Sequence, residues 1–115
     1  REKLPIRPGY DGAIWRYDDP ARVFPRHRHA ELEVNLVTAG SARYLVGSKL
    51  YDLATGAVVW LFPGEEHVLV EQTRDCRMWI GVFAPVLLRR VCTEPEHRVL
   101  RARRPDGDFA ARLPG

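Results

Sequence analysis

Short apolar runs, separated by turn-forming residues at regular intervals, dominate the chain. The runs are rich in Val, Leu, Tyr, Trp and Phe, and Gly, Pro, Thr or Asp lies between them. Many short strands spaced about 8–12 residues apart are typical of an antiparallel sandwich or barrel. The predicted strands span residues 13–17, 21–24, 31–38, 42–46, 49–53, 57–62, 67–72 and 77–83. The pattern therefore predicts an all-β fold.

Polar and apolar residues alternate in the predicted strand 31–38, which gives it two different faces. One face carries Glu31, Glu33 and Asn35, and the other carries Leu32, Val34 and Leu36. If the polar face lines a barrel, the apolar outer face needs cover, either from a helix predicted after residue 85 or from a second subunit. An ordinary second core layer is the alternative, and a β-bulge would remove the inference.

Two other strand regions have distinct signals. The runs 42–46 and 49–53 flank Gly47 and Ser48, which predicts a tight β-hairpin. The run 57–62 is continuously apolar, as expected of a strand buried on both faces.

The pattern changes after Pro85, where apolar residues take helical spacing over 86–92 and again around 97–104. We therefore expect a barrel domain with an N-terminal arm over residues 1–85 and a helical, Arg-rich tail over 86–115. Residues 1–88 carry 11 basic and 11 acidic side chains, whereas residues 89–115 carry seven Arg against four acids. The basic tail is either a solvated end or a connection toward a DNA-binding neighbour.

Composition bounds the class of protein. A chain of 115 residues makes one ordinary domain. The longest apolar run has six residues, far short of the about 20 that a membrane span needs. The chain lacks an initiator Met, which indicates a piece of a longer protein or a processed one. Cys76 and Cys92 are interpreted as reduced thiols of a cytoplasmic protein, with a Cys76–Cys92 bridge as the alternative.

Three of the four His residues fall into a pattern with one carboxylate. His27, His29 and Glu33 share strand parity, so one extended segment can aim all three at one point. His67 follows a Pro-Gly turn at the start of another strand. Neutral imidazole and carboxylate are common ligands of divalent first-row metals. The spacing therefore indicates a site for Zn, Ni, Mn or Fe with a position open to water, substrate or an effector. The alternative is that these are ordinary strand residues without a metal, because His and Glu are common on strands.

The segment His27-x-His29-x-x-x-Glu33, with Gly40 seven positions after Glu33, resembles the first motif of the cupin superfamily. The segment GAVVWLFPGEEH, which ends at His67, resembles the second. This resemblance implies a double-stranded β-helix (jelly-roll) barrel with His27, His29, Glu33 and His67 lining one end. The stretch from His27 to Leu69, followed by MWIGVFAPVLLRRV, resembles the N-terminal sensor of AraC-type transcriptional regulators. That resemblance implies a dimerising, effector-binding domain, with DNA contacted only through a helix-turn-helix domain that this chain lacks.

Large side chains on the predicted strands supply candidates for an effector pocket: Tyr44, Trp60, Arg77 and Trp79. Most buried aromatic residues are simply core, and the Trp79–Arg77 pair is the weaker signal. The alternative to a sensor is a stand-alone metal-dependent cupin enzyme, an isomerase or dioxygenase acting on a small oxygen-rich substrate. No nucleophile and base pair stands out, so hydrolase chemistry has no support. We expect a sensor more than an enzyme.

Overall fold

The computed structural model describes residues 10–18, 31–101 and 110–112 of the chain. The predicted strand 21–24, His27 and His29 lie outside these residues. The strands are β1 (Gly12–Tyr17), β2 (Leu32–Ala39), β3 (Ala42–Val46), β4 (Lys49–Leu53), β5 (Ala57–Leu61), β6 (His67–Gln72), β7 (Arg77–Phe83) and β8 (Ala110–Arg112). Between β7 and β8 lie the helix α1 (Pro85–Val91) and the 3₁₀ helix η1 (Pro95–Arg101).

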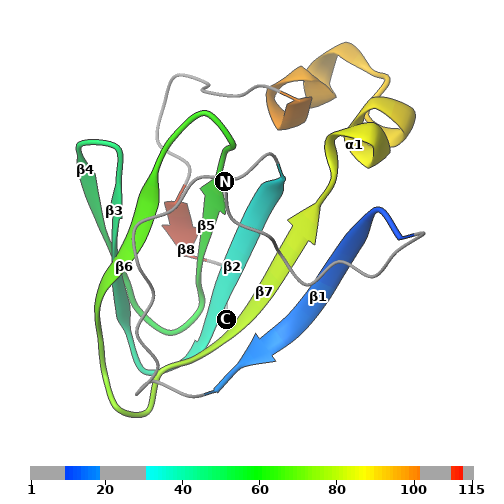
Figure 1. Cartoon of the computed structure of the whole chain (residues 1–115). Helices are drawn as coiled ribbons and strands as arrows, with labels where there is room; N and C mark the ends of the chain where they lie inside the picture. Colours follow the sequence, from blue (N-terminus) through cyan, green and yellow to red (C-terminus); the bar gives the residue numbers. More distant parts are fainter. Residues whose placement is uncertain (1–9, 19–30, 102–109, 113–115) are drawn as a thin grey trace.

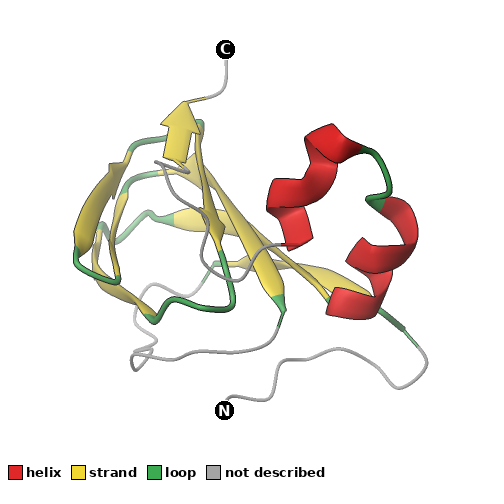
Figure 2. Ribbon diagram, turned by 90° about the horizontal axis from the view of Figure 1, so that it is seen from above, coloured by secondary structure: helices red, strands yellow, loops and turns green. Residues whose placement is uncertain are grey.

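The strands form two antiparallel sheets, with order β1-β7-β2-β5-β8 in one and β4-β3-β6 in the other. The sheets face each other and enclose the interior of the molecule (Figure 1). Seen from above, α1 and η1 lie beside the strands rather than between the sheets (Figure 2). The expected all-β, jelly-roll barrel with a short helical segment after it is confirmed. No described helix is long and apolar enough to cross a membrane.

Turn chemistry fixes the connections around β3. Gly47, in the predicted hairpin between β3 and β4, has φ +58°, and Gly40, between β2 and β3, has φ +68°. These left-handed conformations suit glycine because it has no Cβ. A Cβ at Gly40 would also lie only 2.9 Å from the backbone nitrogen of Cys76. The two turns therefore depend on glycine, and the hairpin has the bounds that the sequence predicts.

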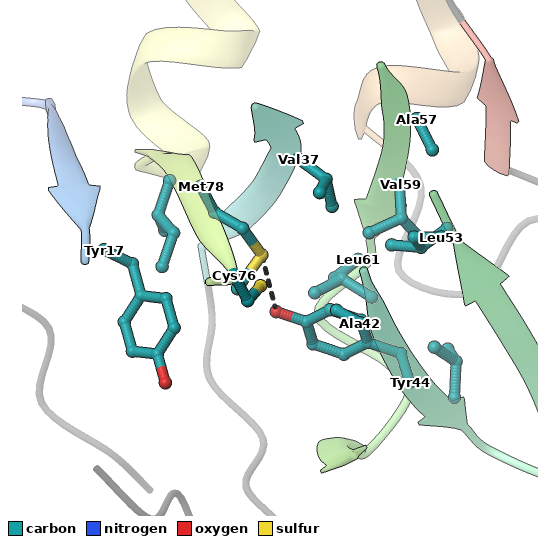
Figure 3. Close-up of a cluster of buried hydrophobic side chains, with 12 residues drawn as sticks. Tyr17, Val37, Ala42, Tyr44, Leu53, Ala57, Val59, Leu61, Cys76 and Met78 are labelled. Atoms are coloured by element: carbon teal, nitrogen blue, oxygen red, sulfur yellow. Dashed lines mark hydrogen bonds between the residues drawn. The ribbon is translucent and has the colours of Figure 1, made fainter. Parts of the chain in front are cut away.

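Buried side chains from both sheets pack together in one core (Figure 3). The buried core cluster consists of Tyr17, Val37, Ala42, Tyr44, Val46, Leu53, Ala57, Val59, Leu61, Cys76, Met78 and Ile80. Cys76 and Cys92 are both free and buried, so no bridge joins them.

Strand β5 differs from the prediction for 57–62. Ala57, Val59 and Leu61 are buried, but Val58 and Trp60 are only partly buried. The strand therefore alternates between an inner and an outer face. A continuous apolar run does not reveal this alternation, because both faces of the sheet carry apolar side chains here.

The segment after β7 is short and lightly packed. Pro85 begins α1, where its missing N–H leaves no hydrogen bond unmade. No residue of α1 is buried. Asp11, just before β1, accepts a backbone hydrogen bond from Ala84 at 2.7 Å and pairs with Arg90 at 3.1 Å. The chain then returns to the barrel, where β8 pairs with β5 at the edge of the larger sheet. This last strand was not expected from the sequence.

Candidate functional site

The inner face of β2 is polar at its first positions. Glu33 and Asn35 are 7% and 0% exposed, and Val37 continues the same face into the apolar core. The register of β2 with β7 shifts only between Val37 and Ala39. The alternation that the sequence predicts therefore holds over the polar positions, and a carboxylate and an amide point into the barrel.

His67 lies close to Glu33 because of how β5 connects to β6. Glu33 pairs in register with Leu61, the last residue of β5, and the chain turns back over residues 62–66 to begin β6 at His67. The side chain of His67 is 2% exposed, and its Nε2 lies 3.6 Å from Glu33 Oε1. The structure thus brings together two of the four predicted metal ligands, both buried at one end of the barrel.

Asn35 links Glu33 to the opposite sheet. Its Nδ2 donates one hydrogen bond to Glu33 Oε2 at 2.8 Å and another to the hydroxyl of Tyr44 on β3 at 2.9 Å. The Tyr44 hydroxyl donates in turn to the sulfur of Met78 on β7 at 3.7 Å, the dashed line in Figure 3. Four polar side chains therefore follow one another through the interior of the barrel. We call this set the polar line: His67, Glu33, Asn35 and Tyr44.

Burial strongly affects the polar line. It raises the pKa of the Tyr44 phenol far above its ordinary value, and the charge of Glu33 raises this pKa further. Tyr44 therefore stays protonated and donates its hydrogen bond at any physiological pH. Among the described residues, Asn35 Oδ1 has no hydrogen-bond partner. A buried acceptor without a partner costs about 1–3 kcal/mol, which makes the orientation of this amide notable.

Within the described residues, the donor atoms of Glu33 and His67 are of the kind, and close to the separation, that a divalent metal requires. Metal–ligand bonds of about 2.0–2.2 Å place two ligand atoms of one ion about 3.0–3.5 Å apart. The 3.6 Å between Glu33 Oε1 and His67 Nε2 is close to that separation. No group of three or more His, Cys, Asp or Glu side chains suited to a metal occurs within the described residues. The other two predicted ligands, His27 and His29, lie outside these residues.

The four candidates for an effector pocket separate in the structure. Tyr44 is buried in the interior beside the polar line. Trp60 and Trp79 instead alternate with the inward residues of β5 and β7, and Trp79 is 43% exposed. Arg77 shares the outward parity of Trp79 and donates to the backbone oxygen of Cys76 at 2.8 Å. Strand alternation thus places Tyr44 on the inner side and the other three candidates on the outer face.

The outer face of the larger sheet carries an apolar surface. In register, Ile14, Gly81, Val34 and Trp60 form one row across the strands, and Arg16, Trp79, Leu36 and Val58 form the next. The guanidinium of Arg16, not that of Arg77, lies over the Trp79 ring, 5.8 Å from its centroid. Ile14 is 66% exposed. We call these two rows the outer face.

Asn35 is the site residue that the sequence analysis left without a role. Its place on the polar face followed from alternation alone, but its bonds to Glu33 and Tyr44 depend on two sheets packing together. A buried Asn two positions after a predicted ligand is the signal that could have singled it out.

Comparisons with known proteins agree on the fold. Among solved structures, a Cupin 2 conserved barrel domain protein from Salinispora arenicola matches with a TM-score of 0.54 and 22% identity, over 80% of this chain and 81% of the other. Oxalate decarboxylase of Bacillus subtilis, whose Mn(II) centres were studied, matches with a TM-score of 0.55 and 14% identity. That match covers 93% of this chain but only 35% of the decarboxylase. The comparison with curated proteins gave no match.

The family comparison covers most of the barrel. The model of the AraC-like ligand binding domain matches residues 8–83, from before β1 to the end of β7. The matched span includes both sheets apart from β8, and it includes every residue of the polar line. The chain therefore belongs to the AraC-like ligand binding domain family and is a ligand-sensing domain of cupin type.

Proposed function

We propose that this domain is the effector-sensing and dimerisation part of an AraC-type transcriptional regulator, and that it holds a divalent metal and a small molecule inside the barrel. The observation that carries the proposal is the polar line in an otherwise apolar interior. Buried polar groups cost free energy unless they are paired, so a fold gains little by placing them there. A role in binding explains their position.

The proposed metal ligands are Glu33 and His67 together with His27 and His29. Imidazole nitrogen and carboxylate oxygen suit Zn, Ni, Mn or Fe, and four such ligands leave room on a five- or six-coordinate ion. When bound, the metal supplies a positive charge that attracts an oxygen-rich effector. Of the four pocket candidates, Tyr44 is the one whose side chain faces the interior. It is therefore our candidate for contact with the effector.

Metal analysis tests this proposal. We expect about one ion per chain in the purified protein by mass spectrometry of its elements, and loss of the ion in a His27→Ala/His29→Ala double variant. His97 lies outside the ligand pattern, so His97→Ala is the matched control and should keep its metal. Equal metal content in all three proteins would remove the site from the account.

The connection between the barrel and the helical segment supports the regulatory part. Asp11 contacts both Ala84 and Arg90, so the start of β1 is joined directly to α1. A change in the barrel can therefore shift the segment after residue 85, which we propose leads toward a helix-turn-helix DNA-binding domain. The boundary between residues 85 and 86 and the cytoplasmic location are part of the same proposal, and the two free thiols suit a reducing compartment.

The outer face supports the proposed homodimer. Of the two covers considered for it, α1 buries none of its own residues, which favours a second copy of the chain. An exposed Trp and an exposed Ile on adjacent rows of one sheet are the kind of apolar surface that partners cover.

A stand-alone metal enzyme is the second candidate, and the buried Glu33–His67 pair favours it because a catalytic metal needs the same ligands. Oxalate is a suitable probe, since one structural neighbour is an oxalate decarboxylase. If the domain is a sensor, the oxalate concentration should stay unchanged when metal-loaded protein is incubated with oxalate. Steady consumption of oxalate, abolished in the His27→Ala/His29→Ala variant, would favour the enzyme.

A further inference from the structure

The two carboxylate oxygens of Glu33 have different surroundings. Oε2 accepts a hydrogen bond of 2.8 Å from Asn35, whereas Oε1 faces His67 Nε2 at 3.6 Å. Asn35 is fully buried, so water does not compete for this bond. Asn35 thus engages one oxygen, and the other oxygen faces the second predicted ligand, His67.

We propose that Asn35 is a positioning residue of the metal centre: by engaging Oε2, it makes Glu33 present Oε1 alone to the ion. The inference rests on the metal site of the proposed function and adds a residue to it. A carboxylate that binds through one oxygen takes up one coordination position instead of two. Asn35 therefore helps to keep a position open on the metal.

Tyr44 acts as a brace for this amide. Its hydroxyl accepts the second proton of Asn35 Nδ2 at 2.9 Å, and it comes from the opposite sheet. A rotation of the amide by half a turn would place Oδ1 against the Glu33 carboxylate, where two acceptors repel. Both bonds therefore fix the same orientation, and they do so although Oδ1 gains no partner within the described residues. The observed orientation of the amide thus favours the bond to Glu33 over a partner for Oδ1.

Cobalt(II) is the probe for the test, because its visible absorption reports the number and geometry of its ligands. The proteins are the wild type, Asn35→Leu, Asn35→Asp and Tyr44→Phe, with Tyr17→Phe as the matched control. Tyr17 is also buried and also donates its hydroxyl proton across the sheets, but to Gln72 on β6 at 2.9 Å. Calorimetric titration gives the Kd, and the absorption spectrum gives the coordination.

We expect Asn35→Leu to weaken cobalt binding about 10- to 100-fold and to change the spectrum, because groups that orient a metal ligand typically carry that much affinity. Asn35→Asp should do the same, since an ionised carboxylate cannot donate to Glu33. Tyr44→Phe should have a smaller effect, and Tyr17→Phe none. If Asn35→Leu does not fold, Asn35→Asp and Tyr44→Phe decide.

The outcomes separate the inference from the function on which it rests. If the wild type binds no cobalt, the metal centre and the role of Asn35 both fail. If the wild type binds cobalt and the Asn35 variants match its Kd and spectrum, the metal centre stands and the positioning role is overturned. A uniform loss of affinity in every variant, Tyr17→Phe included, also overturns it, because general loosening of the core would then be the cause.

Discussion

The first positions of strand β2 carry the opposite chemistry on their two faces to what burial alone favours. The inner face of β2 begins with Glu33 and Asn35, whereas the outer face carries Val34 and Leu36, with Trp79 beside them on β7. In an ordinary sheet with one solvated side, the apolar residues lie inside and the polar residues outside. The reversal is local, because Val37 and Met78 return the inner face to apolar packing.

This comparison separates stability from binding. The apolar inner residues hold the two sheets together, and the polar residues at one end provide chemistry that the fold itself does not require. The apolar outer face, by the same reasoning, is the surface that we propose for association. Three predictions examine these assignments, beginning with the largest expected effect.

The first prediction compares the same substitution on both faces. Leu61→Ala removes a fully buried side chain from the core and should lower the free energy of unfolding by about 2–5 kcal/mol. Leu36→Ala, on the outer face, should cost less than half as much in the monomer, because this side chain is only partly buried. Urea unfolding of both variants gives the two values. Equal losses would mean that the outer face is a second core layer.

The second prediction concerns association. Trp79→Glu places a charge in the middle of the outer face, so the proposed dimer should dissociate to a chain of half the mass. Light scattering after size-exclusion chromatography measures that mass. The variant should stay folded, since Trp79 is 43% exposed and the new carboxylate lies near Arg16. Val70→Glu, at an exposed position on the other sheet, is the control that should leave the mass unchanged. A dimer that survives Trp79→Glu would place the interface elsewhere.

The third prediction concerns Tyr44 and pH. Because its pKa is raised in the fold, Tyr44 keeps its proton while the unfolded chain loses one above about pH 10. Its contribution to stability is therefore complete below that pH and declines as pH rises, by about 1.4 kcal/mol per pH unit. Tyr44→Phe should be about 1 kcal/mol less stable than wild type at pH 7, from lost hydrogen bonds, and this difference should shrink above pH 10.

Unfolding curves at pH 7 to 11 measure this trend. Tyr10→Phe is the control, because Tyr10 is 64% exposed and should leave the pH dependence unchanged. A constant difference between wild type and Tyr44→Phe at all pH values would show that the Tyr44 phenol is not protected by the fold.

Much of the fold could be predicted because alternation and turn residues are local signals. The hairpin around Gly47 and the strands β6 and β7 have the bounds expected from the sequence. Strand β8 was missed, since three residues of sequence Ala-Ala-Arg carry no pattern and acquire their strand conformation only by pairing with β5. Local sequence patterns do not show which distant strand a segment will pair with.

The site could be predicted in part. The approach of His67 to Glu33 was expected, because both motifs place their residues at strand ends that meet. The locations of Trp60 and Trp79 were not, since a run of apolar residues does not say which of them face inward. The bonds of Asn35 to Glu33 and Tyr44 needed the packing of two sheets, which sequence spacing does not describe.

The central claim is that the polar line serves binding and not folding. The most direct test is a triple variant, Glu33→Met/Asn35→Leu/Tyr44→Phe, in which apolar groups of similar size replace both partners of the Asn35–Glu33 and Asn35–Tyr44 hydrogen bonds. Replacing whole hydrogen-bonded sets by apolar groups is often neutral or stabilising. We predict that the metal-free triple variant has a free energy of unfolding at least equal to that of the metal-free wild type, and that it binds no cobalt. A triple variant that is several kcal/mol less stable, or that still binds cobalt as the wild type does, would contradict the account.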